Sequence, residues 1–141
     1  MGKFEKIYES IVKTYTDETV SEGIDDKLKE DVYKIFRKNN FVDKVTYTTK
    51  QPSIIATKYV VENLKGYDII PCEGKYMDYK YYFSIIDIGG EKMVVDLGNN
   101  IDGKIIPKVV KLNDDYRITK KYTPRNFLKN YPKLEKQYNQ E

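Results

Sequence analysis

Residues 79–98, with the sequence YKYYFSIIDIGGEKMVVDLG, constrain the fold more than any other segment. Alternating apolar residues on both sides of Gly89-Gly90 are typical of two antiparallel strands joined by a tight turn. The second of these strands ends on Asp96. We therefore expect a β-hairpin here, and the rest of the chain has to build a sheet around it.

The first half of the chain is predicted to be mainly helical. Residues 3–15 place Phe4, Ile7, Ile11 and Tyr15 along one helical stripe. A second helix is expected from Asp25 to Asn40, with acidic residues in its first turn and basic residues in its last, which suits the helix dipole. A short strand is expected at 42–49. A third helix is predicted from Ser53 to Lys65, with Gly66 just beyond its end.

The second half is predicted to be mainly sheet. Residues 67–72 are a strand candidate, and residues 105–112 and 116–122 are expected to pair as a second hairpin across Asn113-Asp114-Asp115. Thr123-Pro124 has the residue types of a helix cap followed by proline in the first turn. A C-terminal helix, interrupted near Pro132, is expected to follow.

These elements predict an α+β fold with an antiparallel sheet of four to six strands, on which N-terminal helices and a C-terminal helix pack. A chain of 141 residues is long enough for one domain with its own core and too short for two. We expect one domain over residues 1–141. Residues 1–40 form its helical part, 41–122 its sheet with the helix 53–65, and 123–141 a helical tail.

The composition restricts the chemistry. The chain has no histidine and one cysteine, Cys72, so zinc binding and an intramolecular disulfide are not expected. The acidic segment around Asp102 lacks the order of ligands of a calcium loop, and no phosphate-binding glycine motif occurs. We therefore expect no metal and no cofactor. A catalytic Cys72 is disfavoured, because no histidine is present to act as its base.

Targeting signals are not evident either. The N-terminal segment lacks the apolar core of a secretory signal, and no stretch approaches the length of a membrane span. A cytoplasmic location without membrane contact is the default expectation. Frequent Lys, Ile, Asn and Tyr indicate an AT-rich genome, as in many bacteria and phages.

The order of a helix starting near Ser53, a strand and then the hairpin resembles the papain-like and transglutaminase-like cysteine enzymes over residues 50–98. In that family the helix begins at a nucleophilic cysteine, a following strand carries a histidine, and the next strand carries an aspartate or asparagine. The resemblance places Ser53 at the nucleophile, Tyr81 or Tyr82 at the base, and Asp96 at the orienting carboxylate.

Two of the three positions depart from the family pattern. A tyrosine with an ordinary pKa near 10 is a poor base at neutral pH, and a serine without a base is almost inert. The resemblance therefore implies a pseudoenzyme, with Ser53, Tyr82 and Asp96 as vestigial positions. A plainer interpretation also stands, in which Ser53 caps a helix, Tyr82 belongs to the core and Asp96 ends a strand.

The favoured function is non-catalytic binding of another protein, as an inhibitor, adaptor or immunity-type factor. Tyrosine offers a large contact area at a small entropic cost, and the chain has 14 tyrosines. The expected binding residues are those clustered in the first strand of the hairpin and just before it: Tyr76, Tyr79, Tyr81 and Tyr82. A buried face of the hairpin would explain the same cluster.

Two alternatives remain. Residues 104–141 carry 10 Lys and Arg against 4 Asp and Glu, and cations interleaved with aromatic residues suit nucleic acid. The residues expected to make such contacts are Lys104, Lys108, Lys111, Arg117, Lys120, Lys121 and Arg125. The other alternative is an atypical hydrolase or transferase that works without histidine. The oligomeric state and the identity of a partner are not encoded in any recognisable pattern.

Overall fold

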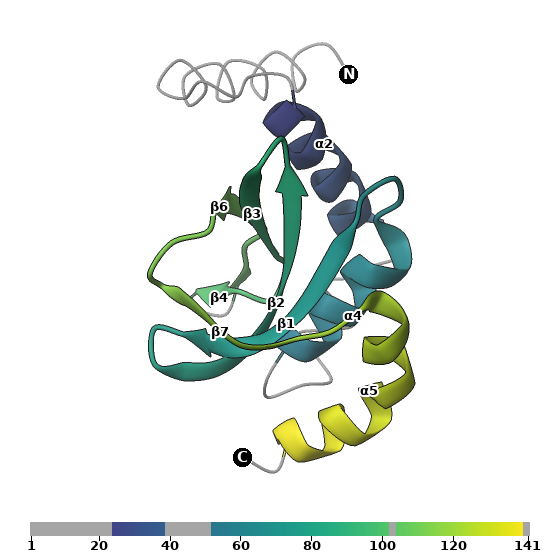
Figure 1. The fold of residues 1–141 in the computed structure, drawn as a ribbon, viewed down its shortest axis with the longest axis vertical. Helices are drawn as coiled ribbons and strands as arrows, with labels where there is room; N and C mark the ends of the chain where they lie inside the picture. Colours follow the sequence, from purple (N-terminus) through teal and green to yellow (C-terminus); the bar gives the residue numbers. More distant parts are fainter. Residues whose placement is uncertain (1–23, 39–51, 102–103, 140–141) are drawn as a thin grey trace.

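A computed structural model of the protein describes residues 24–38, 52–101 and 104–139. The predicted helix at 3–15 and the predicted strand at 42–49 lie outside these residues. The described part is an α+β domain with a five-stranded antiparallel sheet, as the sequence predicts. Figure 1 shows the helices gathered on one side of this sheet.

The helices form close to their predicted positions. Helix α2 spans Ile24–Arg37, and helix α4 spans Ser53–Asn63. Each buries an apolar stripe, which includes Leu28 and Val32 in α2 and Val60 in α4. These stripes join the larger of two hydrophobic clusters, which lies between the helices and the sheet.

The C-terminal helix α5, Pro124–Asn139, begins as expected. The Thr123 hydroxyl accepts the N–H of Asn126 at 3.1 Å, which caps the helix. The expected interruption at Pro132 is wrong, because the helix continues through it. Pro132 has no N–H to donate to the Leu128 carbonyl, and both residues are exposed.

The sheet is a meander whose last strand returns to the first. Strands β1 (Ile69–Tyr76), β2 (Tyr79–Ile88), β3 (Glu91–Asp96) and β6 (Lys108–Lys111) lie side by side in chain order, and β7 (Tyr116–Lys121) pairs with β1. The short strands β4 (Asn100–Ile101) and β5 (Lys104–Ile105) pair with each other. The predicted hairpin at 79–98 is confirmed, with positive φ at Gly89 and Gly90 as a type I′ turn requires.

The second predicted hairpin is wrong. Its two strands exist as β6 and β7, but β6 pairs with β3 and β7 pairs with β1, at opposite edges of the sheet. The turn at Asn113 does form, since the Asn113 side chain accepts the N–H of Asp115 at 2.9 Å. A turn signal fixes where a chain reverses, and it does not fix which neighbour the next strand finds.

The sheet is curled, and its concave face is the one opposite the helices. The Tyr116 hydroxyl on β7 donates a 2.7 Å hydrogen bond to Asp96 at the end of β3, although β1 and β2 lie between these strands. In a flat sheet, three strand spacings would separate their backbones by about 14 Å. The concave face encloses the smaller hydrophobic cluster, which includes Cys72, Phe83, Ile85, Val94 and Tyr116.

At Gly74 the backbones of β1 and β7 approach each other closely. A Cβ added there would lie 1.8 Å from the carbonyl oxygen of Arg117, where β1 and β7 meet at a bulge. We expect Gly74→Ala to lower the free energy of unfolding by about 3 kcal/mol, because backbone has to move to relieve the overlap. Gly89→Asn is the matched control, since its turn has open space and asparagine tolerates positive φ. Chemical denaturation of both variants measures the difference, and equal stabilities would contradict the close packing of β1 and β7.

Candidate functional site

The three positions of the suggested catalytic set do not share a cleft. Ser53 and Tyr82 belong to the side of the sheet that the helices cover, whereas Asp96 is bonded to the tyrosines of the concave face. This separation follows from the strand period of two, which sends neighbouring side chains to opposite faces. Ser53, Tyr82 and Asp96 therefore do not form one site.

Ser53 fastens three elements together. It is the first residue of α4 and is fully buried, and its Oγ lies 2.7 Å from the Tyr138 hydroxyl of α5. The same oxygen accepts the backbone N–H of Tyr82 at 3.1 Å. The plainer expectation that Ser53 caps its own helix is also wrong, because Pro52 occupies the cap position and no side chain caps the helix.

Tyr82 is a core residue, as the plainer interpretation expected. Only 1% of it is exposed, and its hydroxyl donates to Glu73 at 2.6 Å. Burial, together with the Glu73 carboxylate, raises the pKa of Tyr82 above its ordinary value. A phenol held in this way remains a protonated hydrogen-bond donor at neutral pH.

Tyr81, the other position considered for the base, does meet Asp96. Its hydroxyl lies 2.8 Å and 3.0 Å from the two carboxylate oxygens. Asp96 also accepts hydrogen bonds from Tyr116 and, at 2.9 Å, from the N–H of Gly98. Asp96 is 1% exposed, so these donors satisfy a charge that burial would otherwise destabilise.

Two further side chains extend this cluster. The Tyr76 ring lies between those of Tyr81 and Tyr116, with centroid distances of 5.2 Å and 4.8 Å. The ammonium group of Lys108 donates to the Tyr76 hydroxyl at 2.9 Å. We call these five residues, Tyr76, Tyr81, Asp96, Lys108 and Tyr116, the tyrosine–carboxylate network.

The hydrogen bonds of the network offset part of the cost of burying the Asp96 charge. Burial raises the pKa of Asp96, and the hydrogen bonds from Tyr116 and Tyr81 oppose that rise. Burial and the nearby carboxylate raise the pKa of Tyr81 and Tyr116. Both phenols therefore remain donors at neutral pH, and the oxygens of Asp96 are already occupied by them.

Cys72 has the surroundings of a structural cysteine. It is fully buried in the concave cluster, and its thiol donates to the Ile70 carbonyl at 3.3 Å. Burial raises the pKa of the Cys72 thiol to about 12, against the opposing effect of Lys121. A thiol with this pKa is almost entirely protonated at neutral pH and is a weak nucleophile.

The four tyrosines predicted as a binding surface are placed differently from one another. Tyr79 is 77% exposed, whereas Tyr82 is buried on the helix side. Tyr76 and Tyr81 are half-buried in the tyrosine–carboxylate network. One continuous surface made of all four does not exist, because strand alternation divides them between two faces. The exposed neighbour that the sequence did not single out is Met77, at 59% exposure.

The cations expected to contact nucleic acid are dispersed. Lys108 is bound to Tyr76, and Lys111 forms a 3.3 Å ion pair with Glu91. Arg117, Lys120 and Lys121 are exposed on the edge strand β7, while Lys104 lies on β5 and Arg125 lies in the first turn of α5. Cations on an edge strand also discourage pairing with other strands.

Comparisons of the chain with protein-family models, curated proteins and solved structures found no match. Within residues 24–38, 52–101 and 104–139, no group of three or more potential ligands from His, Cys, Asp and Glu is placed to hold a metal ion. In the same ranges, no helix is long and apolar enough to cross a membrane.

The Ser53 hydroxyl can be tested as a fastener. We expect Ser53→Ala to lower the free energy of unfolding by about 1–3 kcal/mol, because the buried N–H of Tyr82 loses its acceptor. Thr123→Ser, which keeps an exposed cap hydroxyl, is the control and should change stability little. If urea denaturation shows that Ser53→Ala is as stable as the wild type, Ser53 does not fasten these elements together.

The buried carboxylate predicts a pH dependence. The pKa of Asp96 is higher in the folded than in the unfolded protein, so its stabilising protonated form is lost as pH rises through the folded pKa. The stability of the wild type relative to Asp96→Asn should therefore fall as the pH rises above about 4, the ordinary pKa of an aspartate. Chemical denaturation across this range measures the difference. A difference that rises with pH would show that the hydrogen bonds outweigh burial.

Proposed function

We propose that this protein is a non-catalytic binder of an acidic protein partner, acting as an inhibitor, adaptor or immunity-type factor. The scaffold that we propose for it is a degenerate form of the papain-like and transglutaminase-like fold. The observation that carries the proposal is the exposure of Met77 and Tyr79 at the tip of the β1–β2 hairpin. We call this tip, with Lys75 and Arg117 on the strands beside it, the tip surface.

The two tip residues have the chemistry of an interface centre. Tyr79 is 77% exposed and Met77 59% exposed, and they flank the single residue Asp78. Tyrosine and methionine are enriched where proteins bind one another, and a few such residues supply most of the binding free energy. Large side chains held this far into water on a turn are available for a partner.

The tip is held in one conformation before binding. Met77 and Asp78 have φ values of 50° and 76°, as a two-residue type I′ turn requires, although neither is glycine. The Met77 N–H donates to the Asp115 carbonyl at 3.0 Å, which ties the turn to the link before β7. A fixed turn reduces the entropy that binding costs.

The charge beside the tip favours an acidic partner. The register places Lys80, Lys75 and Arg117 opposite one another on three adjacent strands. Like charges directly across a sheet are mutually unfavourable, and a partner's carboxylates would relieve that repulsion. The acidic residue Asp78 lies at the turn itself, and the positive row runs across the three strands, on the face opposite to that of Tyr79.

The states of the candidate nucleophiles support the non-catalytic part of the proposal. The Ser53 hydroxyl is bonded on two sides within the core, and the Cys72 thiol is buried with a pKa raised to about 12. The tyrosines near Asp96 donate to a carboxylate and do not accept protons from a nucleophile. The chain has no histidine that could serve as a base for the Ser53 hydroxyl or the Cys72 thiol.

The proposal predicts a partner that depends on the tip. Affinity capture from the protein's own cells, followed by purification of the captured protein, supplies the partner for calorimetry. We expect Tyr79→Ala to weaken its binding by about 30-fold, which corresponds to a loss of about 2 kcal/mol. Leu128→Ala is the control, because Leu128 is also a partly exposed apolar side chain but lies on α5.

Salt and charge provide a second measurement on the same complex. Lys75→Gln together with Arg117→Gln should slow association and reduce its dependence on ionic strength. Capture of nucleic acid, lost on nuclease treatment, would support the alternative that uses the basic residues of the last third. Equal affinities of the wild type and Tyr79→Ala would refute the tip surface.

A further inference from the structure

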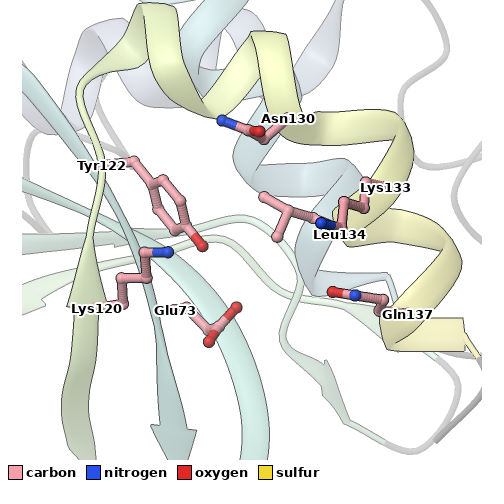
Figure 2. A pocket seen from close by; sticks show the side chains of 7 residues that line it. All are labelled: Glu73, Lys120, Tyr122, Asn130, Lys133, Leu134 and Gln137. Atoms are coloured by element: carbon pink, nitrogen blue, oxygen red, sulfur yellow. The ribbon is translucent and has the colours of Figure 1, made fainter.

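A hollow of about 260 Å³ lies between the strands β1 and β7 and the helix α5. Figure 2 shows side chains converging on it from two sides, the strands on one side and the helix on the other. Its lining is mainly polar and consists of Glu73, Lys120, Tyr122, Asn130, Lys133, Leu134 and Gln137.

The hollow exists because α5 leans away from the edge strand. The helix buries Phe127, Tyr131 and Leu134 against the domain, and it contacts α4 and β1. A link of two residues, Tyr122 and Thr123, joins β7 to α5. The next stripe of the helix, Asn130, Lys133 and Gln137, therefore faces the gap beside β7 (Figure 2).

Opposite charges face this gap without pairing with each other. Glu73 and Lys120 are direct neighbours in the β1–β7 register, yet no ion pair within 4.0 Å joins Glu73 to Lys120 or Lys133 in this part of the structure. Glu73 instead accepts the Tyr82 hydroxyl through Oε1 at 2.6 Å. The ammonium group of Lys120 lies 4.9 Å from the centre of the Tyr122 ring.

The support beneath Glu73 is rigid. Tyr82 is 1% exposed, and its ring packs edge-on against Tyr138 with the centroids 5.1 Å apart. This core tyrosine fixes one carboxylate oxygen of Glu73 and leaves the other to the hollow. An acceptor is therefore held on the strand side, and cationic and amide donors stand around it.

We propose that the hollow binds a small zwitterion of the α-amino acid class. Its ammonium group bonds Glu73, and its carboxylate bonds Lys120 and Lys133, with the amides of Asn130 and Gln137 completing the hydrogen bonds. A simple anion would lie against Glu73, and a simple cation would lie against two lysines, so only a ligand with both charges matches the lining.

The volume of the hollow and its apolar floor restrict the class of ligand further. Its volume is at the small end for ligand sites, which suits a single amino acid and not a nucleotide. Tyr122 and Leu134 are each 9% exposed and provide a limited apolar floor for a short side chain. This site is separate in its residues from the tip surface, so it does not rest on the proposed function.

The test is a titration of the full chain with each free L-α-amino acid at millimolar concentration, followed by NMR and calorimetry. We expect at least one amino acid to shift the resonances of the hollow's residues. For that ligand, the amine without the carboxylate and the acid without the ammonium group should each bind at least tenfold more weakly. Equal binding of either analogue would refute the zwitterion.

Variants then locate the site. Lys133→Gln alters an exposed side chain, and Glu73→Gln keeps an acceptor for Tyr82, so both should fold, which circular dichroism checks. Each should weaken binding at least tenfold, whereas Lys129→Gln, elsewhere on α5, should not. The proposal fails if no amino acid shifts these resonances, or if Lys133→Gln binds as tightly as the wild type.

Discussion

The hydrogen bond between Tyr116 and Asp96 is the interaction on which the shape of the sheet depends. It joins the edge strand β7 to the third strand of the meander across the concave face. A buried carboxylate without donors would destabilise the fold strongly. The charge of Asp96 therefore needs the curl that supplies a donor, and the curl is held by the hydrogen bond to that charge. The curl brings Tyr116 to Asp96, Tyr81 reaches it from the neighbouring strand β2, and the two phenols offset part of the cost of burying that charge.

The helix side of the sheet has a corresponding polar fastening. Ser53 joins α4 to a backbone N–H of β2 and to Tyr138 of α5, and the Tyr138 hydroxyl also donates to the Lys80 carbonyl at 3.0 Å. Gly98 lies against the start of α4 so closely that a Cβ there would be 2.6 Å from the Cα of Ser53. Directional bonds of this kind fix how helices lie on a sheet, whereas hydrophobic contact alone permits sliding.

Local signals in the sequence predicted most elements of the fold. Gly89-Gly90, Thr123-Pro124 and the stripe through Leu28 each specify a structure within a few residues, and each is found where expected. Pairing at a distance was not predictable in this way. The partner of β7 is β1, about 45 residues earlier in the chain, and nothing near Asn113 encodes that choice.

The candidate site shows the same limit. Alternation along residues 79–98 was visible, yet which of Tyr81 and Tyr82 faces Asp96 depends on the register between β2 and β3. Tyr116 could not be connected to Asp96 from the sequence, since their contact requires the curl. The exposure of Tyr79 was the part of the tyrosine cluster that a turn signal at Met77-Asp78 could have revealed, but neither residue is glycine.

The pairing of β7 with β1 has a consequence for folding while the chain is being synthesised from its N-terminus. Residues 116–139 complete both layers of the domain, since β7 brings Tyr116 to the concave face and α5 brings Phe127 to the helix face. While the ribosome still holds this segment, both hydrophobic clusters lack a wall and remain open to water. The domain therefore becomes stable only after residues 116–139 have left the ribosome, and until then its apolar strands need protection from aggregation.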